Sequence, residues 1–121
     1  MYSEDDPYLS ELRTVCLALP EATEVEAWGR PTFRAGKIFA TFSGIESRPY
    51  GVIFKPEPGE RAALIEDARF YAPPYYGPGG WLALDFEAAP VDWDEVGELV
   101  EGSYRQVALK RMLTVLDART A

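Results

Sequence analysis

The chain contains no histidine. Without an imidazole there is no Ser–His or Cys–His nucleophile pair and no histidine general base near neutral pH. The same absence excludes every zinc site that uses histidine. Carboxylates and lysines would catalyse reactions only with strongly shifted pKa values. We therefore expect a protein that is not an enzyme, with no catalytic residues, no cofactor and no bound metal.

Cysteine and long apolar runs are also scarce. Cys16 is the only cysteine, so an internal disulfide and a cysteine cluster for metal are both excluded. No apolar run approaches the ~20 residues that cross a bilayer. The acidic N-terminal sequence has no apolar stretch of the kind found in signal peptides. We expect a cytoplasmic protein that does not enter membranes.

The length and the hydrophobic content of the chain suffice for one folded domain. The chain has 121 residues, of which 47% are hydrophobic and 13% aromatic. A chain of this length can bury roughly two-thirds of its unfolded surface. There is no internal repeat, linker or change of composition, so we expect a single domain over residues 1–121.

Periodicity predicts the order of the elements. Asp6-Pro7 is typical of a helix start, and an apolar stripe with helical spacing continues from there to Pro20. Alternating patterns then predict several strands, a short helix, a loop over residues 71–80, a last strand and a C-terminal helix. The expected strands are 24–28, 32–34, 37–42, 50–55 and 81–86, and the expected later helices are 59–68 and one that starts at Asp92 and breaks near Ser103. An α+β fold, with an antiparallel sheet and helices packed on one face, accommodates this order.

Charge is distributed unevenly along the chain. The net charge is −8, which is the wrong sign for a typical nucleic-acid-binding protein. Between Arg30 and Lys55, however, five cations accompany one carboxylate, a net charge of +4. The remainder holds 7 basic and 19 acidic residues, a net charge of −12. A positive segment is thus embedded in a negative body.

The hairpin within this positive segment is the most informative local feature. Ala35-Gly36 lies between two alternating segments and predicts a two-residue β-hairpin. Arg34 and Lys37 would then lie directly opposite each other beside the turn, where like charges are destabilising. Two interpretations stay open: a solvated pair that nearby glutamates balance, or a cationic tip that binds an anion such as a phosphate.

Several short motifs, taken in order, resemble the MmcQ/YjbR family from Leu12 to Leu113. They are Leu19-Pro20, Glu24, Trp28-Gly29, Pro31-Thr32-Phe33, Gly36-Lys37-Ile38-Phe39-Ala40, Lys55, Gly80-Trp81 and Ser103-Tyr104-Arg105. The resemblance implies a CyaY-like α+β fold in a double-wing arrangement. It also implies a DNA-binding role and no catalytic residues.

The first hypothesis for function is a non-enzymatic binding module for DNA. Binding would be weak and dependent on salt, because it would rest on phosphate contacts. The cations expected to make these contacts through the basic hairpin are Arg30, Arg34, Lys37 and Lys55, joined by Arg105 from the C-terminal helix.

The second hypothesis is a small-molecule or protein-interaction domain. Its site would be an aromatic and basic cleft in which a cation holds a small anionic ligand. The cleft would be lined by Trp28, Trp81, Tyr104 and the 71–80 loop. A third hypothesis, a frataxin-like metal-binding function, rests only on the fold analogy and the excess of carboxylates.

Overall fold

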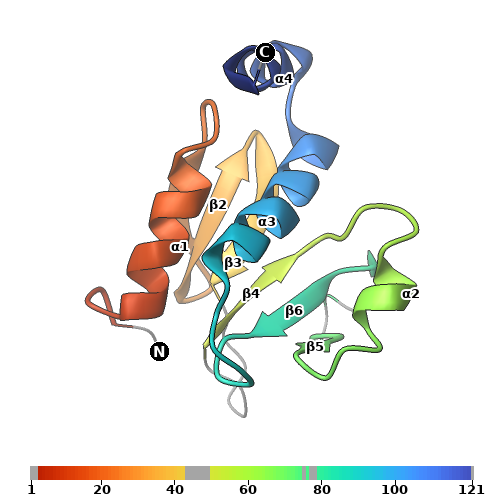
Figure 1. Ribbon diagram of the computed structural model, residues 1–121. Coiled ribbons are helices and arrows are strands. Elements are labelled where there is room, and N and C mark those ends of the chain that lie inside the picture. Colours follow the sequence, from red (N-terminus) through yellow and green to blue (C-terminus); the bar gives the residue numbers. More distant parts are fainter. Residues whose placement is uncertain (1–2, 43–49, 75, 77–78, 121) are drawn as a thin grey trace.

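The fold combines one antiparallel sheet of six strands with four helices (Figure 1). The computed structural model describes residues 3–42, 50–74, 76 and 79–120, so the loop expected over 43–49 lies outside the described residues. In chain order the elements are α1 (Pro7–Leu17), β1 (Thr23–Ala27), β2 (Arg30–Ala35), β3 (Lys37–Phe42), β4 (Gly51–Phe54), α2 (Arg61–Leu64), β5 (Phe70–Tyr71), β6 (Leu82–Asp85), α3 (Trp93–Val107) and α4 (Lys110–Thr120). The predicted α+β class is confirmed.

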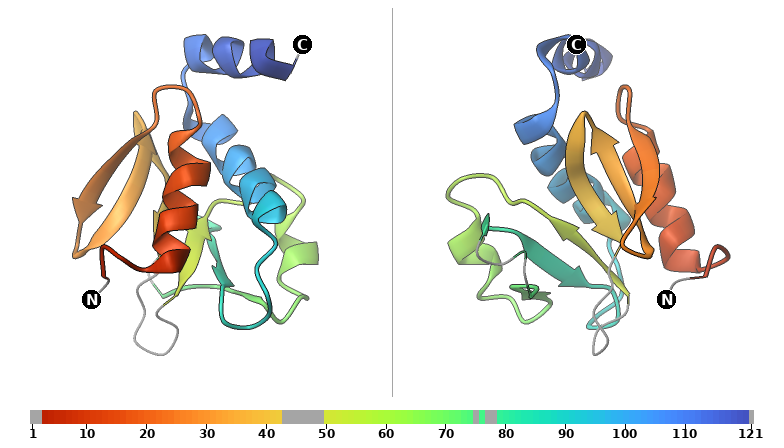
Figure 2. Two further views of the ribbon diagram at one scale, coloured as in Figure 1. Left: turned by 60° about the vertical axis from the view of Figure 1, so that its left-hand side comes forward. Right: turned by 180° about the vertical axis from the view of Figure 1, so that it is seen from behind.

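The strands lie in the order β1-β2-β3-β4-β6-β5, and every neighbouring pair is antiparallel. Helices α1 and α3 pack against one face of this sheet, and the view from behind shows the strands in front of them (Figure 2). We call the face toward α1 and α3 the helix-side face and the opposite face the outer face. Helix α4 lies at one end of the molecule, where Met112 and Leu116 are buried against the core.

The first helix begins as the sequence predicts. Asp6 is its N-cap, and the carboxylate Oδ1 accepts hydrogen bonds from the backbone N–H of Tyr8 at 2.8 Å and of Leu9 at 3.3 Å. Pro7 follows at a position where a backbone N–H would have no partner in the helix. The apolar stripe is buried at Leu9, Leu12 and Cys16.

The break expected in the C-terminal helix lies elsewhere. Helix α3 runs without interruption from Trp93 to Val107, and α4 starts three residues later. Gly102 does not interrupt α3. A glycine at this position leaves room for the side chain of Glu57, since a Cβ atom there would lie 3.0 Å from Glu57 Oε1. The absence of a side chain lets the segment after β4 lie against the helix.

Two smaller elements also differ from expectation. The helix predicted over 59–68 is a single turn, α2. Strand β5 has only two residues and was not predicted, since a run that short carries no periodicity. Among the described residues, no helix combines the length and apolarity that a bilayer crossing needs.

Candidate nucleic-acid interface

Strand alternation separates the charges of β1 and β2. Arg34 pairs with Thr23 and Arg30 pairs with Ala27, whereas Glu24 pairs with Phe33. Phe33 is fully buried in the core beneath the helices, so Glu24 is on the helix-side face. Residues opposite each other share a face and successive residues alternate. Arg30 and Arg34 are therefore on the outer face.

Hydrogen bonds hold Arg34 on that face. Its Nε donates to Thr32 Oγ1 at 3.2 Å, and this hydroxyl donates to the backbone carbonyl of Val25 at 2.5 Å. Arg34 is half-buried, and no carboxylate in the described part of the chain forms an ion pair with it. The guanidinium thus keeps its terminal amino groups available for a ligand.

The centre of the outer face is closed to solvent. Thr32, Thr41, Ile53 and Ala83 each expose 1% of their surface or less. Thr41 Oγ1 is buried and has no hydrogen-bond partner among the residues that the structure describes, which is costly for a hydroxyl. The accessible part of this face is therefore its border.

Lys55 belongs to the same border. It directly follows Phe54, whose side chain is in the core and which pairs with Ala40 and Leu82. Lys55 is the first residue beyond β4, at the end of the sheet where Arg34 also lies, and extending the alternation by one residue assigns it to the outer face. Its backbone is fixed, because the Lys55 N–H donates to Ser103 Oγ at 3.0 Å and its carbonyl accepts from the Gln106 side chain at 2.8 Å.

The prediction that Arg34 and Lys37 lie directly opposite each other is wrong. Arg34 pairs with Ile38, and Lys37 pairs with Ala35 across Gly36. The register shifts at Phe33 and Arg34, a β-bulge that adds one residue to the facing strand. Gly36 has φ of +79°, a backbone conformation that glycine adopts readily in a turn and that residues with a side chain rarely adopt. Arg34 and Lys37 consequently leave the hairpin from opposite faces.

Arg105 forms ion pairs with two carboxylates. Its Nε lies 3.2 Å from Glu101 Oε2 and its second amino group lies 2.9 Å from Asp117 Oδ1. The side-chain hydrogen bond that Arg105 donates to Asp117, and then the one it donates to Glu101, raise the pKa of Arg105 above its usual range. These two ion pairs engage the charge of Arg105 between α3 and α4, so we leave the residue out of the contact set proposed below.

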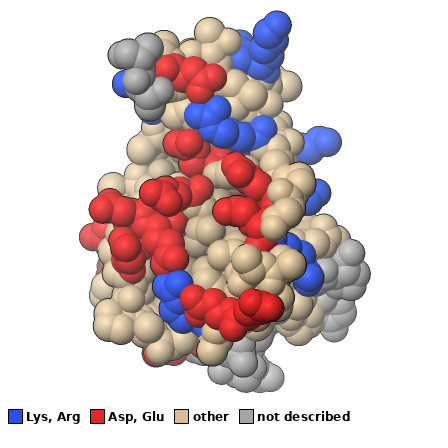
Figure 3. Space-filling view, turned by 45° about the vertical axis from the view of Figure 1, so that its right-hand side comes forward, with Lys and Arg blue, Asp and Glu red and all other residues tan. Residues whose placement is uncertain are grey.

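Other arginines outside the positive segment are also paired. Arg13 binds Glu24 and Glu4, Arg69 binds Glu95 and Asp67, and Arg111 binds Glu21. Carboxylates predominate on the face over α2 and α3 (Figure 3). They border a groove of about 350 Å³ whose lining is Glu57, Glu60, Leu64, Glu95, Glu98 and Leu99. The helical side over α2 and α3 is thus acidic, whereas the cations of β2, Arg30 and Arg34, lie on the outer sheet face.

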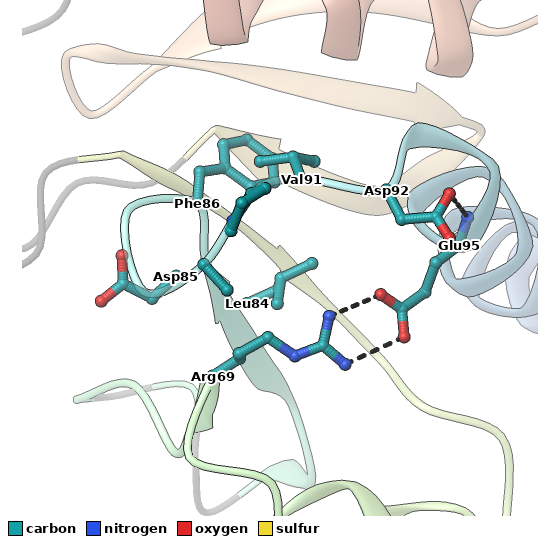
Figure 4. Close-up of a pocket in the computed structure, with 9 residues that line it drawn as sticks. Arg69, Leu84, Asp85, Phe86, Val91, Asp92 and Glu95 are labelled. Carbon is teal, nitrogen blue, oxygen red and sulfur yellow. Dashed lines mark hydrogen bonds and ion pairs between the residues drawn. The ribbon is translucent and has the colours of Figure 1, made fainter.

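The acidic groove does not resemble a metal centre. Within the described ranges, no three carboxylate or thiol side chains converge as a metal ion would require. Glu95 is held instead by Arg69, with two bonds of 2.7 and 3.1 Å (Figure 4). The cavity beside this pair measures only about 10 Å³, roughly the size of one water. Sequence reasoning missed the pair, because Arg69 and Glu95 lie 26 residues apart.

The structure does not bring together the three aromatic residues predicted to line a cleft, Trp28, Trp81 and Tyr104. Tyr104 is fully buried, and its hydroxyl donates to the Pro20 carbonyl at 2.7 Å. Burial raises the pKa of Tyr104. Trp28 follows the Ala27 end of β1, whereas Trp81 precedes Leu82, which pairs with Phe54 at the other end of the sheet. Residues 75, 77 and 78 of the expected loop lie outside the described residues.

Comparison with known proteins gives a family and a fold. The family model described as YjbR matches residues 17–106. The crystal structure of Deinococcus radiodurans protein DR2400, with domain DUF419, aligns with a TM-score of 0.67 and 21% sequence identity. The alignment covers 79% of this chain and 75% of that one. No curated protein matches the chain significantly.

Proposed function

The chain belongs to the YjbR family, and on that premise we propose that its outer face binds nucleic acid through phosphate contacts. The observation that carries the proposal is the separation of charge by strand alternation. Arg30 and Arg34 are on the outer face, whereas Glu24, one strand away, is on the helix-side face and bound to Arg13. Guanidinium groups suit phosphate because their planar donors match its oxygens.

Three cations make up the proposed contact set: Arg30, Arg34 and Lys55. Each phosphate contact contributes about −0.9 to the slope of log affinity against log salt on duplex DNA, so three predict a slope of about −2.7. Lys37 is exposed at the turn but leaves the hairpin from the other face. Phosphate contacts carry no direct sequence information, so binding tolerates sequence changes.

The acidic body weakens this binding without preventing it. Charges more than about 10 Å apart are largely screened at 0.1 M salt. The carboxylates over α2 and α3 and the cations of the sheet are on different faces. A bound phosphate therefore interacts mainly with the outer face, while the net charge of −8 keeps the overall affinity low.

The test is a salt titration of binding to a short DNA duplex by fluorescence anisotropy. The wild type should give a slope near −2.7 and a double variant, Arg34→Glu with Lys55→Glu, a slope near −0.9. Because the cost of reversing a charge exceeds that of removing it, the double variant should also bind more weakly at every salt concentration.

The matched control carries Lys110→Glu and Arg111→Glu, two exposed positions of α4. It changes the net charge by the same amount but leaves the outer face intact. Control and wild type should give the same slope. Equal slopes for all three proteins, or a loss confined to the α4 control, would contradict the proposed interface.

A further inference from the structure

Trp28 is the most exposed large hydrophobic side chain among the described residues. It presents 76% of its surface to solvent, whereas Leu109, the next, presents 50%. Trp81 is half-buried against Tyr76, and Trp93 packs against Phe86 in the core. An indole left in water forgoes the burial that normally stabilises tryptophan. Folding alone does not account for its position.

The backbone at Trp28 is also unfavourable for its side chain. Trp28 has φ of +53° and Gly29 has φ of +76°, and together they join β1 to β2. Two central residues at positive φ make a turn of the type I′ pattern, in which Asn-Gly is the favoured sequence. A bulky residue in the left-handed region is a genuine outlier. Strain of this kind concentrates at sites with a function.

The turn holds the indole beside the proposed interface. Arg30 comes two residues after Trp28, pairs with Ala27, and lies on the outer face with Arg34. An aromatic surface adjoining a row of cations is the arrangement by which proteins bind single strands, because the cations follow the backbone and the ring stacks on a base. The ring is free to do so, since most of its surface is uncovered.

We propose that Trp28 stacks on an unpaired base, so that the nucleic acid this protein prefers is single-stranded or has unpaired bases. This inference rests on the proposed function and specifies which form of nucleic acid the protein prefers. In a duplex each base face is covered by its neighbours, and stacking requires costly opening of the helix. In a single strand the face is available at once.

The experiment compares wild type with Trp28→Ala on two probes, a single-stranded oligothymidylate and a blunt duplex of equal length. The substitution should weaken single-strand binding about 5- to 140-fold, the range expected for one stacked base. Duplex binding should change by less than about twofold, because the cations remain. Trp28→Phe, which keeps a ring, should retain most of the single-strand affinity.

A second variant separates folding from binding. Trp28→Asn creates the favoured Asn-Gly turn, so its melting temperature should rise while its single-strand affinity falls like that of the alanine variant. If Trp28→Asn is more stable than the wild type yet binds a single strand more weakly, unfolding cannot explain the loss of affinity. A lower melting temperature for Trp28→Asn would overturn the inference, because the turn would then not be strained.

The remaining outcomes distinguish this inference from the proposed function. If Trp28→Ala binds both probes as the wild type does while the Arg34→Glu, Lys55→Glu protein loses binding, the stacking role is wrong and the interface stands. If the wild type binds neither probe, both proposals fail. If Trp28→Ala loses only the binding of vesicles containing an anionic lipid, the indole serves a membrane surface and the inference is overturned.

Discussion

The side chains of Glu24 and Arg34 leave neighbouring strands on opposite faces of the sheet. Glu24 pairs with Phe33 on the helix-side face and accepts two hydrogen bonds from Arg13, each of 2.8 Å. Arg34, the next residue after Phe33, is bonded to the hydroxyl of Thr32 on the outer face. The sheet therefore keeps a carboxylate away from a nearby guanidinium, which stays available to an anion.

A carboxylate added to the outer face should reverse this separation. Thr23 pairs with Arg34 and is exposed, so Thr23→Glu places a negative charge directly across from the guanidinium. Cross-strand pairs of opposite charge attract, and the new pair would compete with phosphate. We expect nucleic-acid affinity to fall several-fold and the salt slope to become shallower by about 0.9.

Thr14→Glu is the control for that substitution. Thr14 is exposed on α1, so the change in net charge is the same while the outer face is untouched. It should alter the affinity little. Equal effects of Thr23→Glu and Thr14→Glu on anisotropy titrations would mean that only the overall charge matters.

Ser103 is expected to stabilise the junction between α3 and the middle of the sheet. Its buried hydroxyl donates to the Phe39 carbonyl at 2.6 Å and accepts from the Lys55 N–H at 3.0 Å. Ser103→Ala leaves both backbone groups without that partner, which costs about 1–3 kcal/mol. Urea unfolding should show this loss, whereas Ser10→Ala, an exposed position on α1, should stay within about 0.5 kcal/mol of wild type. A stability loss no larger than that of Ser10→Ala would show that the bridge contributes nothing.

Tyr104 is expected to matter for stability and not for binding. Tyr104→Phe removes the hydrogen bond to the Pro20 carbonyl and should cost about 1 kcal/mol in urea unfolding. Nucleic-acid affinity should be unchanged, because the ring is inside the core. The comparison is Tyr8→Phe, at a half-buried position whose hydroxyl makes no hydrogen bond to another described residue. Weaker nucleic-acid binding by a fully folded Tyr104→Phe protein would contradict this expectation and would support the predicted role of Tyr104 in a ligand site.

Local chemistry made much of the fold predictable. A cap at Asp6 followed by Pro7 specified the start of α1, and Asp92 caps α3 through the N–H groups of Asp94 and Glu95. These signals depend on residues a few positions apart. The carboxylate of Glu95, by contrast, binds Arg69 from a distant part of the chain, which no local signal predicts.

The candidate site was predictable only in part. The sequence indicated a positive segment, and alternation alone would have placed Arg30 and Arg34 on one face. The bulge that separates Arg34 from Lys37, and the partners of Arg105, depend on how distant elements pack. Trp28-Gly29 was recognised as a strand end, but the exposure and positive φ of Trp28 follow from the turn geometry.

Acid should remove one electrostatic contribution to stability. The side-chain hydrogen bond from Arg69, and then its backbone N–H, lower the pKa of Asp67. A carboxyl whose folded pKa is depressed stabilises the fold above its unfolded pKa of about 3.9, and the contribution disappears as pH falls through the lower folded value. Wild type should therefore melt at a higher temperature than Asp67→Asn at neutral pH. The gap should begin to narrow below about pH 4 and close once the pH is below the lowered folded pKa. A gap that persists unchanged there would contradict this role.

The most direct test of the account is a titration of isotopically labelled protein with a single-stranded oligonucleotide, followed by amide chemical shifts. We predict shifts that depend on salt at Arg30, Thr32, Arg34 and Lys55, with a further change at the Trp28 indole N–H. The amides of α1 and of the acidic groove beside α3 should stay in place. Shifts centred on the helices, or none at near-millimolar oligonucleotide, would contradict binding by the outer face.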